Sequence, residues 1–182
     1  EKRKEVAIKE VTKKFDNYEG EIIVTKEKIE EASKNVDQKT KDDVKFAYDR
    51  VRKFAEHQLK SMNNNFEVEL SKGLFAGQRL IPVETAGCYI PGGRYAHISS
   101  AVMAITPAKV AGVGTIICAS PPKGNDGANA GIIYAANLCG ADVIMNLGGV
   151  AAIGSLTHGL FGNPPVDFLV GAGNQYVAEA KR

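Results

Sequence analysis

The chain has 182 residues, of which 44% are hydrophobic and 24% charged, and its formal net charge is +2. This length can bury a sizeable core without disulfide or metal support. The small net charge argues against nucleic acid or a membrane surface as the partner, and no apolar run is long enough to cross a bilayer.

Charged residues and glycines divide the chain into two regions. Residues 1–82 hold 34 of the 44 charged side chains, whereas 16 of the 19 glycines follow residue 82. A charge-rich, glycine-poor segment is typical of solvated helices, and a glycine-rich, apolar segment is typical of an α/β unit with tight turns. We predict a charged helical lead-in over residues 1–65 and a Rossmann-like α/β domain over residues 66–182.

The lead-in predicts three amphipathic helices. Apolar residues recur at helical spacing in residues 1–16, Thr25 can cap a short helix, and Asp37 can cap a longer one. An apolar stripe on the longer helix predicts a buried face, which either the rest of the chain or a second subunit would cover. The stripe consists of Val44, Tyr48, Val51, Ala55 and Leu59.

Strands and helices then alternate. Residues 66–70 have the period of a half-exposed strand, and residues 80–90 form a second extended stretch. Later strands that are apolar throughout predict a parallel sheet covered by helices on both faces, the pattern of a Rossmann-like half-domain. The expected strands are 115–119, 142–147 and 167–170, and the expected helices are 96–112, 128–139, 149–157 and a last one still running at Arg182.

Three glycine-containing turns follow the predicted strands, at the edge where parallel sheets bind ligands. They are Pro121–Gly124, Gly148-Gly149 and Gly171–Asn174, and the last two lead into helices. Glycine permits close approach of the backbone to a ligand, and helix N-termini bind phosphate. None of the turns matches the G-x-G-x-x-G pattern, so nucleotide binding and ligand-free tight turns both remain open.

Histidines and cysteines indicate no metal site. His57, His97 and His158 lie far apart, with no second ligand at helical spacing. The three cysteines have no paired spacing, and no signal peptide is recognisable, which favours buried thiols in a reducing, cytoplasmic compartment.

Several ordered sequence blocks closely resemble the histidinol dehydrogenase family. The resemblance covers the whole α/β region and, more loosely, the lead-in, where Lys14-Phe15-Asp16 also fits. The blocks are Pro82–Gly93, Thr106–Val113, Cys118–Pro122, Gly148–Ile153 and Gly171–Arg182.

This resemblance implies a fold, a reaction and two cofactors. The fold is a Rossmann-like sheet of the histidinol dehydrogenase and aldehyde dehydrogenase type, incomplete here at its carboxyl end. The reaction is NAD-linked, zinc-dependent oxidation of L-histidinol through the aldehyde to L-histidine, the last steps of histidine biosynthesis, by an intertwined homodimer. We expect the chain to be an amino-terminal portion of such an enzyme.

The position of a residue within these sequence blocks indicates which family residue it corresponds to. Tyr89 matches a family tyrosine that contacts NAD, and Asn174 matches an asparagine that does so. A packed aromatic and a helix cap are the alternative roles for these two residues. Ala151 stands where the family has an NAD-contacting glutamine, and Ala172 where it usually has proline.

The family's metal ligands and proton-transfer residues lie beyond these blocks. Its zinc ligands (a glutamine, two histidines and an aspartate) and its catalytic glutamate–histidine pair are therefore expected outside residues 1–182. We assign no catalytic residue and no metal ligand within the chain, and we expect the chain alone to be inactive.

Two other functions remain open. Pro91–Tyr95 and His158–Phe161 look more like the sulfopropanediol dehydrogenase branch, which oxidises another polar alcohol to a carboxylate. An interaction module that binds a nucleotide or a partner without catalysis is the alternative from a different class.

Overall fold

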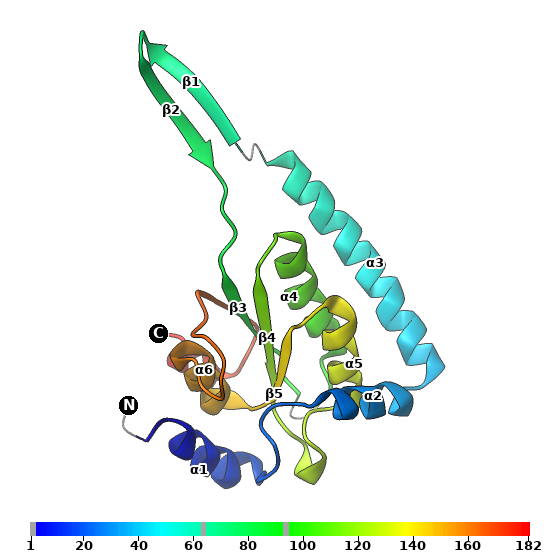
Figure 1. Ribbon diagram of the computed structural model, residues 1–182. Coiled ribbons are helices and arrows are strands. Elements are labelled where there is room, and N and C mark those ends of the chain that lie inside the picture. Colours follow the sequence, from blue (N-terminus) through cyan, green and yellow to red (C-terminus); the bar gives the residue numbers. More distant parts are fainter. Residues whose placement is uncertain (1–2, 63–64, 93–94) are drawn as a thin grey trace.

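The computed structural model describes residues 3–62, 65–92 and 95–182, and its centre is a parallel β-sheet. Four strands lie in the order β5-β4-β3-β6, with helices on both faces (Figure 1). All neighbours pair in parallel, so the four carboxyl ends meet at one edge, as the sequence predicts. The strands are β3 (Thr85–Tyr89), β4 (Thr115–Ser120), β5 (Val143–Asn146) and β6 (Phe168–Val170).

Side chains of the central strands alternate between two apolar clusters, one on each face of the sheet. Ile116 and Cys118 enter one cluster, and Ile117 enters the other. Because both faces are covered, the strands are apolar throughout. The first face carries α4 (Ile98–Val110) and α5 (Ala130–Cys139), with α2 (Lys26–Asn35) and α3 (Gln38–Ser61) packed on them, and the second carries α1 (Lys4–Asp16), α6 (Gly149–His158) and α7 (Gln175–Ala180).

The predicted helix caps of the lead-in are confirmed. Thr25 Oγ1 accepts a hydrogen bond from the Lys28 N–H at 3.3 Å, and Asp37 Oδ1 accepts one from the Thr40 N–H at 2.9 Å. Each bond satisfies an N–H group that the first helical turn leaves without a partner. The start of α2 and of α3 is therefore encoded locally.

The apolar stripe of α3 packs within the chain. Val44 and Ala55 are buried, and Tyr48 and Val51 are half-buried against the cluster that α4 and α5 form. Val44, Tyr48 and Val51 therefore pack within the chain, as the first of the two alternatives predicts. Other residues of α3, among them Phe46 and Phe54, are exposed by 57% and 66%.

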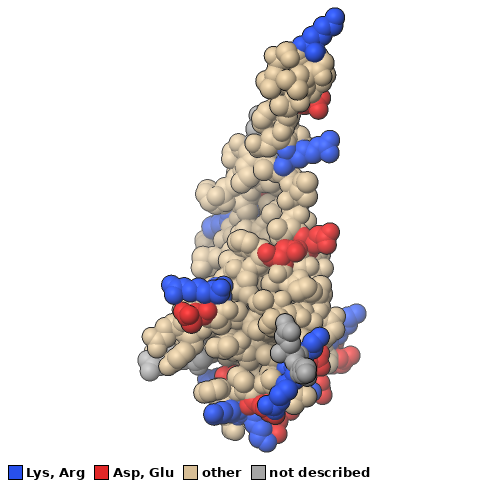
Figure 2. All heavy atoms as spheres, turned by 90° about the vertical axis from the view of Figure 1, so that its left-hand side faces the viewer, with Lys and Arg blue, Asp and Glu red and all other residues tan. Residues whose placement is uncertain are grey.

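A β-hairpin separates α3 from the sheet, and the sequence reading missed its second strand. Strand β1 (Asn65–Ser71) confirms the strand predicted at residues 66–70, and the extended stretch predicted at residues 80–90 contains β3. The unpredicted strand is β2 (Leu74–Arg79), which pairs antiparallel with β1. The chain reverses at Lys72-Gly73, where Gly73 has a φ of +78°. The hairpin extends away from the sheet (Figure 1), every residue in it is exposed, and Figure 2 shows this tapered end with only isolated charges.

Two further observations concern the predicted boundaries. Helix α7 spans Gln175–Ala180; the Lys181 N–H still bonds to the Val177 carbonyl, and the Arg182 N–H bonds to the Glu179 carbonyl. The division into residues 1–65 and 66–182 stays a prediction, and α1 and α2 from the first part pack on α6 and α5 from the second.

The three cysteines are buried and unpaired, as expected. Cys88 and Cys118 have no exposed surface, and Cys139 has 2%. Burial raises the pKa of Cys88 to about 12 and raises that of Cys118 further. Within the described residues, no helix has the length and hydropathy that a membrane span needs.

Candidate functional site

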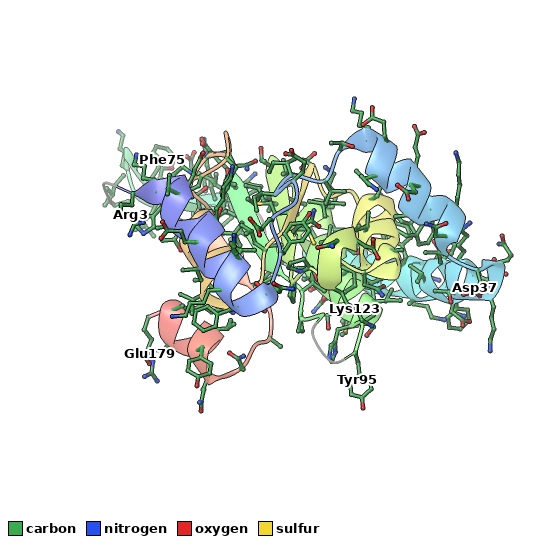
Figure 3. All side chains as sticks on the ribbon, turned by 90° about the horizontal axis from the view of Figure 1, so that it is seen from below. Arg3, Asp37, Phe75, Tyr95, Lys123 and Glu179 are labelled. Atoms are coloured by element: carbon green, nitrogen blue, oxygen red, sulfur yellow. The ribbon has the colours of Figure 1, made fainter. Side chains whose placement is uncertain are left out.

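Two of the predicted glycine turns, with Pro121 from the other, line one cavity of about 750 Å³ at the carboxyl edge of the sheet. Pro121 follows β4, Gly148 and Gly149 follow β5, and Ala172 to Asn174 follow β6, so parallel topology brings them together. Lys123, from the first turn, instead lines a separate hollow beside α2 and α5. In Figure 3 α7, which carries Glu179, lies near the end of α1, and Lys123 lies apart from both.

Tyr89 connects β3 to the start of α6. The Gly149 N–H donates a hydrogen bond to Tyr89 Oη at 3.2 Å, and only 5% of the residue is exposed. Burial raises the pKa of Tyr89 above its ordinary value, and the bond from Gly149 partly offsets this effect. Tyr89 is thus a packed aromatic residue that also lines the cavity.

Asn174 caps α7 and lines the same cavity. Its Oδ1 accepts hydrogen bonds from the Tyr176 and Val177 N–H groups, both at 3.1 Å. The cap uses the amide oxygen, which leaves Nδ2 as the atom that could donate to a ligand. The cap role and a ligand role are therefore compatible.

Gly171, next to the cavity, and Gly149, which lines it, have backbone conformations that other residues rarely adopt. Gly171 has a φ of +138°, and a Cβ atom there would overlap the carbonyl oxygen of Tyr89. Gly149 has a φ of +51°, and a Cβ atom there would meet nothing within 4 Å. The first glycine is required by close packing, and the second leaves open space at the first turn of α6.

The start of α6 suits an anionic group. Gly148 is its N-cap and supplies no side-chain cap, and the Gly149 N–H already donates to Tyr89 Oη. The Val150 and Ala151 N–H groups are therefore the first-turn donors left for a ligand. Ala151 lines the cavity from this turn with 2% exposure and offers no polar atom in place of the family glutamine. A dinucleotide phosphate fits these backbone donors, but a glutamine-type contact is missing.

The described residues bring no metal ligands together. No group of three or more His, Cys, Asp or Glu side chains occurs among them. His57 lies on α3, His97 precedes α4 and His158 ends α6, so the fold keeps the histidines on separate elements. Zinc therefore has no fitting ligand set within this part of the chain.

Helix α1 contributes a wall of the cavity that the sequence did not assign to the site. Val11, Phe15 and Asp16 line it, although they belong to the predicted lead-in. Burial raises the pKa of the Asp16 carboxyl. The available signal was the run Lys14-Phe15-Asp16, which fits the family pattern but carries no role by itself.

A family model described as histidinol dehydrogenase matches residues 1–182. The chain belongs to the histidinol dehydrogenase family. It is 68% identical over 182 residues to a histidinol dehydrogenase homolog from Pelagibacter ubique, covering 100% of this chain and 42% of that protein. It is 53% identical over 169 residues to a sulfopropanediol 3-dehydrogenase from Ruegeria pomeroyi, covering 93% and 39%.

Other members of the histidinol dehydrogenase family match over similar lengths. A histidinol dehydrogenase from Methanococcus maripaludis is 44% identical over 177 residues, with coverage of 97% of this chain and 41% of that protein. The crystal structure of histidinol dehydrogenase from Elizabethkingia anophelis superposes with a TM-score of 0.90 at 33% identity, covering 98% and 41%. The predicted fold is confirmed, and the chain spans about two fifths of the length of these relatives.

Tyr89→Phe is expected to lower the free energy of unfolding by about 1 kcal/mol, because the Gly149 N–H loses its acceptor. Denaturant unfolding of both proteins measures the difference. Tyr134→Phe is the matched control, since Tyr134 is half-buried and no hydrogen bond to its hydroxyl occurs among the described residues. Equal losses in the two variants would contradict the structural role of Tyr89 Oη.

Proposed function

We propose that this chain forms the NAD-binding part of a zinc-dependent, NAD-linked alcohol dehydrogenase. The observation that carries the proposal is the cavity at the carboxyl edge of the sheet, where two glycine turns and Pro121 converge with Tyr89 and Asn174. This edge is where open α/β sheets bind nucleotides. Membership of the histidinol dehydrogenase family supports the same assignment.

The residues of the cavity suit distinct parts of a dinucleotide. The Val150 and Ala151 N–H groups at the start of α6 would bind a phosphate, and Gly149 leaves space for its approach. The Tyr89 ring offers an apolar surface, and Asn174 Nδ2 offers a donor. When bound, the nicotinamide supplies the hydride chemistry.

Zinc and the proton-transfer residues belong to the part of the family enzyme outside residues 1–182. The family resemblance is the basis for this assignment. Zinc would act there as a Lewis acid that holds and polarises the substrate alcohol. The chain itself would bind and orient the cofactor.

L-Histidinol is the first candidate substrate, oxidised through the aldehyde to L-histidine, because relatives that match nearly the whole chain are named histidinol dehydrogenases. Sulfopropanediol is the second candidate, since the relative named for it is 53% identical, against 44% for a named histidinol dehydrogenase. Both substrates are polar alcohols. Initial rates of NAD reduction by the full-length enzyme with each alcohol would decide between them.

The proposal extends to assembly and location. The full-length enzyme would be a cytoplasmic homodimer, as the family resemblance implies. The exposed apolar residues of the hairpin, such as Phe66, Leu70 and Phe75, support burial of this arm in a larger assembly.

The 182-residue chain is expected to bind NAD saturably but not to reduce it. Isothermal titration measures binding, and absorbance of NADH measures reduction in the presence of L-histidinol and zinc. Binding without turnover would support the proposed division between cofactor-binding and catalytic parts.

Two results would contradict this expectation. NAD reduction by the chain alone would show that residues 1–182 suffice for catalysis. A folded chain that binds no NAD would instead favour the non-enzymatic interaction module. Circular dichroism on the same sample establishes that the chain is folded.

A further inference from the structure

Asp16 is the one charged side chain among the described residues that line the cavity. It is the last residue of α1, a helix that packs on α6. Its Oδ2 lies 3.2 Å from the position that a Cβ atom on Gly148 would occupy. The carboxylate therefore lies beside the turn that opens α6, within the proposed dinucleotide site.

Asp16 carries a charge that its own helix disfavours, although the carboxylate lies beside the start of α6. It stands at the C-terminal end of α1, where the helix dipole disfavours an anion. Burial raises its pKa, and no hydrogen bond or ion pair among the described residues offsets this effect. The basic neighbours on α1 are engaged elsewhere, because Lys13 pairs with Glu19 and Lys14 lies 5.4 Å from the ring centre of Phe15.

An unsupported carboxylate that faces a cavity is typical of a group that a ligand satisfies. A carboxylate only accepts hydrogen bonds and is repelled by phosphate, so its partner on a dinucleotide must be a neutral donor. The vicinal hydroxyls of a ribose present two adjacent O–H donors, which match the two oxygens of one carboxylate.

We propose that the Asp16 carboxylate accepts hydrogen bonds from the vicinal hydroxyls of a ribose of NAD. This inference rests on the proposed NAD-binding function and adds a specificity-determining residue to it. A phosphate on the 2′ oxygen of the adenosine ribose would remove one donor and bring negative charge beside the carboxylate. Contact with that ribose therefore predicts preference for NAD over NADP.

The test measures dissociation constants of NAD and NADP for the chain and for Asp16→Asn by isothermal titration. The variant is expected to bind NAD about tenfold more weakly, because a hydrogen bond to a charged acceptor is replaced by a weaker, neutral one. Asp43→Asn is the matched control, since it makes the same change at an exposed carboxylate of α3 that does not line the cavity, and it should leave both constants unchanged.

The pattern across the two nucleotides identifies the ribose. If Asp16→Asn weakens NAD binding more than NADP binding, the contact is with the adenosine ribose. If it weakens the binding of both nucleotides equally, the contact is with the nicotinamide ribose. Either pattern supports the contact. Unchanged NAD binding in Asp16→Asn overturns it and leaves the proposed function intact, whereas a folded parent chain that binds neither nucleotide overturns both.

The dependence on pH supplies an independent readout. Asp16 is the only carboxyl group among the described lining residues, and Tyr89 and Tyr176 are the other titratable groups there. The pKa of Asp16 is raised, and protonation would remove the carboxylate that accepts the ribose hydrogen bonds. NAD affinity should therefore fall as the pH decreases through the pKa of Asp16, and Asp16→Asn should abolish this dependence.

The free energy of unfolding should depend on pH in the opposite direction to NAD affinity. The folded state holds the Asp16 proton more tightly than the unfolded state, so stability falls as pH rises from about 3.8 through the raised pKa. At neutral pH Asp16→Asn should therefore melt at a higher temperature than the parent. A lower melting temperature together with unchanged NAD binding would make Asp16 a structural residue and overturn the proposal.

Discussion

Gly171→Ala is expected to lower the free energy of unfolding by about 3 kcal/mol or more, the largest effect of any single change at the site. Gly171 has a φ of +138°, and an added Cβ atom would overlap the carbonyl oxygen of Tyr89. The variant must therefore separate β6 from β3 or distort the turn before α7. Denaturant unfolding followed by circular dichroism measures the loss.

Gly124→Ala measures the cost of a left-handed backbone conformation where no packing contact is affected. Gly124 also has a positive φ, of +62°, but an added Cβ atom would meet nothing within 4 Å. Its replacement should cost only about 1 kcal/mol, the usual penalty for a left-handed conformation. Similar losses in the two variants would show that contact with Tyr89 does not determine the requirement for glycine.

Asn146→Ala is expected to destabilise the fold by about 3 kcal/mol, because it leaves several buried polar groups without partners. Asn146 is 6% exposed at the carboxyl end of β5. Its Oδ1 accepts from the Ala128 N–H at 2.8 Å, and its Nδ2 donates to the Glu21 carbonyl at 2.8 Å and to Tyr18 Oη at 3.1 Å. Thermal unfolding, with the enthalpy measured by calorimetry, gives the change.

Asn129→Ala is the matched change, since it deletes the same amide at a less buried position. Asn129 caps α5 through one bond, from the Gly131 N–H to Oδ1 at 2.9 Å, and loss of such a cap costs about 1 kcal/mol. If Asn146→Ala were no more destabilising than this variant, the bonds from β5 to the segment after α1 would contribute little to stability.

Local signals in the sequence predicted most of the sheet and its helices. The caps at Thr25 and Asp37, the glycine that ends α5, and the apolar strands act within a few residues, so their patterns are readable. The hairpin was missed although Lys72-Gly73 separates two apolar runs. Both strands are exposed, but only β1 alternates apolar and charged residues; the β2 sequence, Leu74 to Arg79, lacks this alternation, so no strand was predicted there.

From the sequence, we could predict only those parts of the candidate site that the parallel strand topology brings together. Parallel strands place their carboxyl ends together, so the convergence of the glycine turns with Tyr89 followed from strand order. Contacts made by α1 and the segment after it depend on packing between distant parts of the chain. Asn146 and Tyr18, for example, are 128 residues apart, and the position of Asp16 against Gly148 is equally non-local.

The native fold protects its three thiols from oxidation by burying them. While the sheet is closed, Cys88, Cys118 and Cys139 are inaccessible and remain protonated, so oxidants find no thiolate to attack. Opening the core restores ordinary thiol acidity to all three at once. Under oxidising conditions, non-native disulfides would then form before the chain refolds, and reversible unfolding would become irreversible loss of the folded protein.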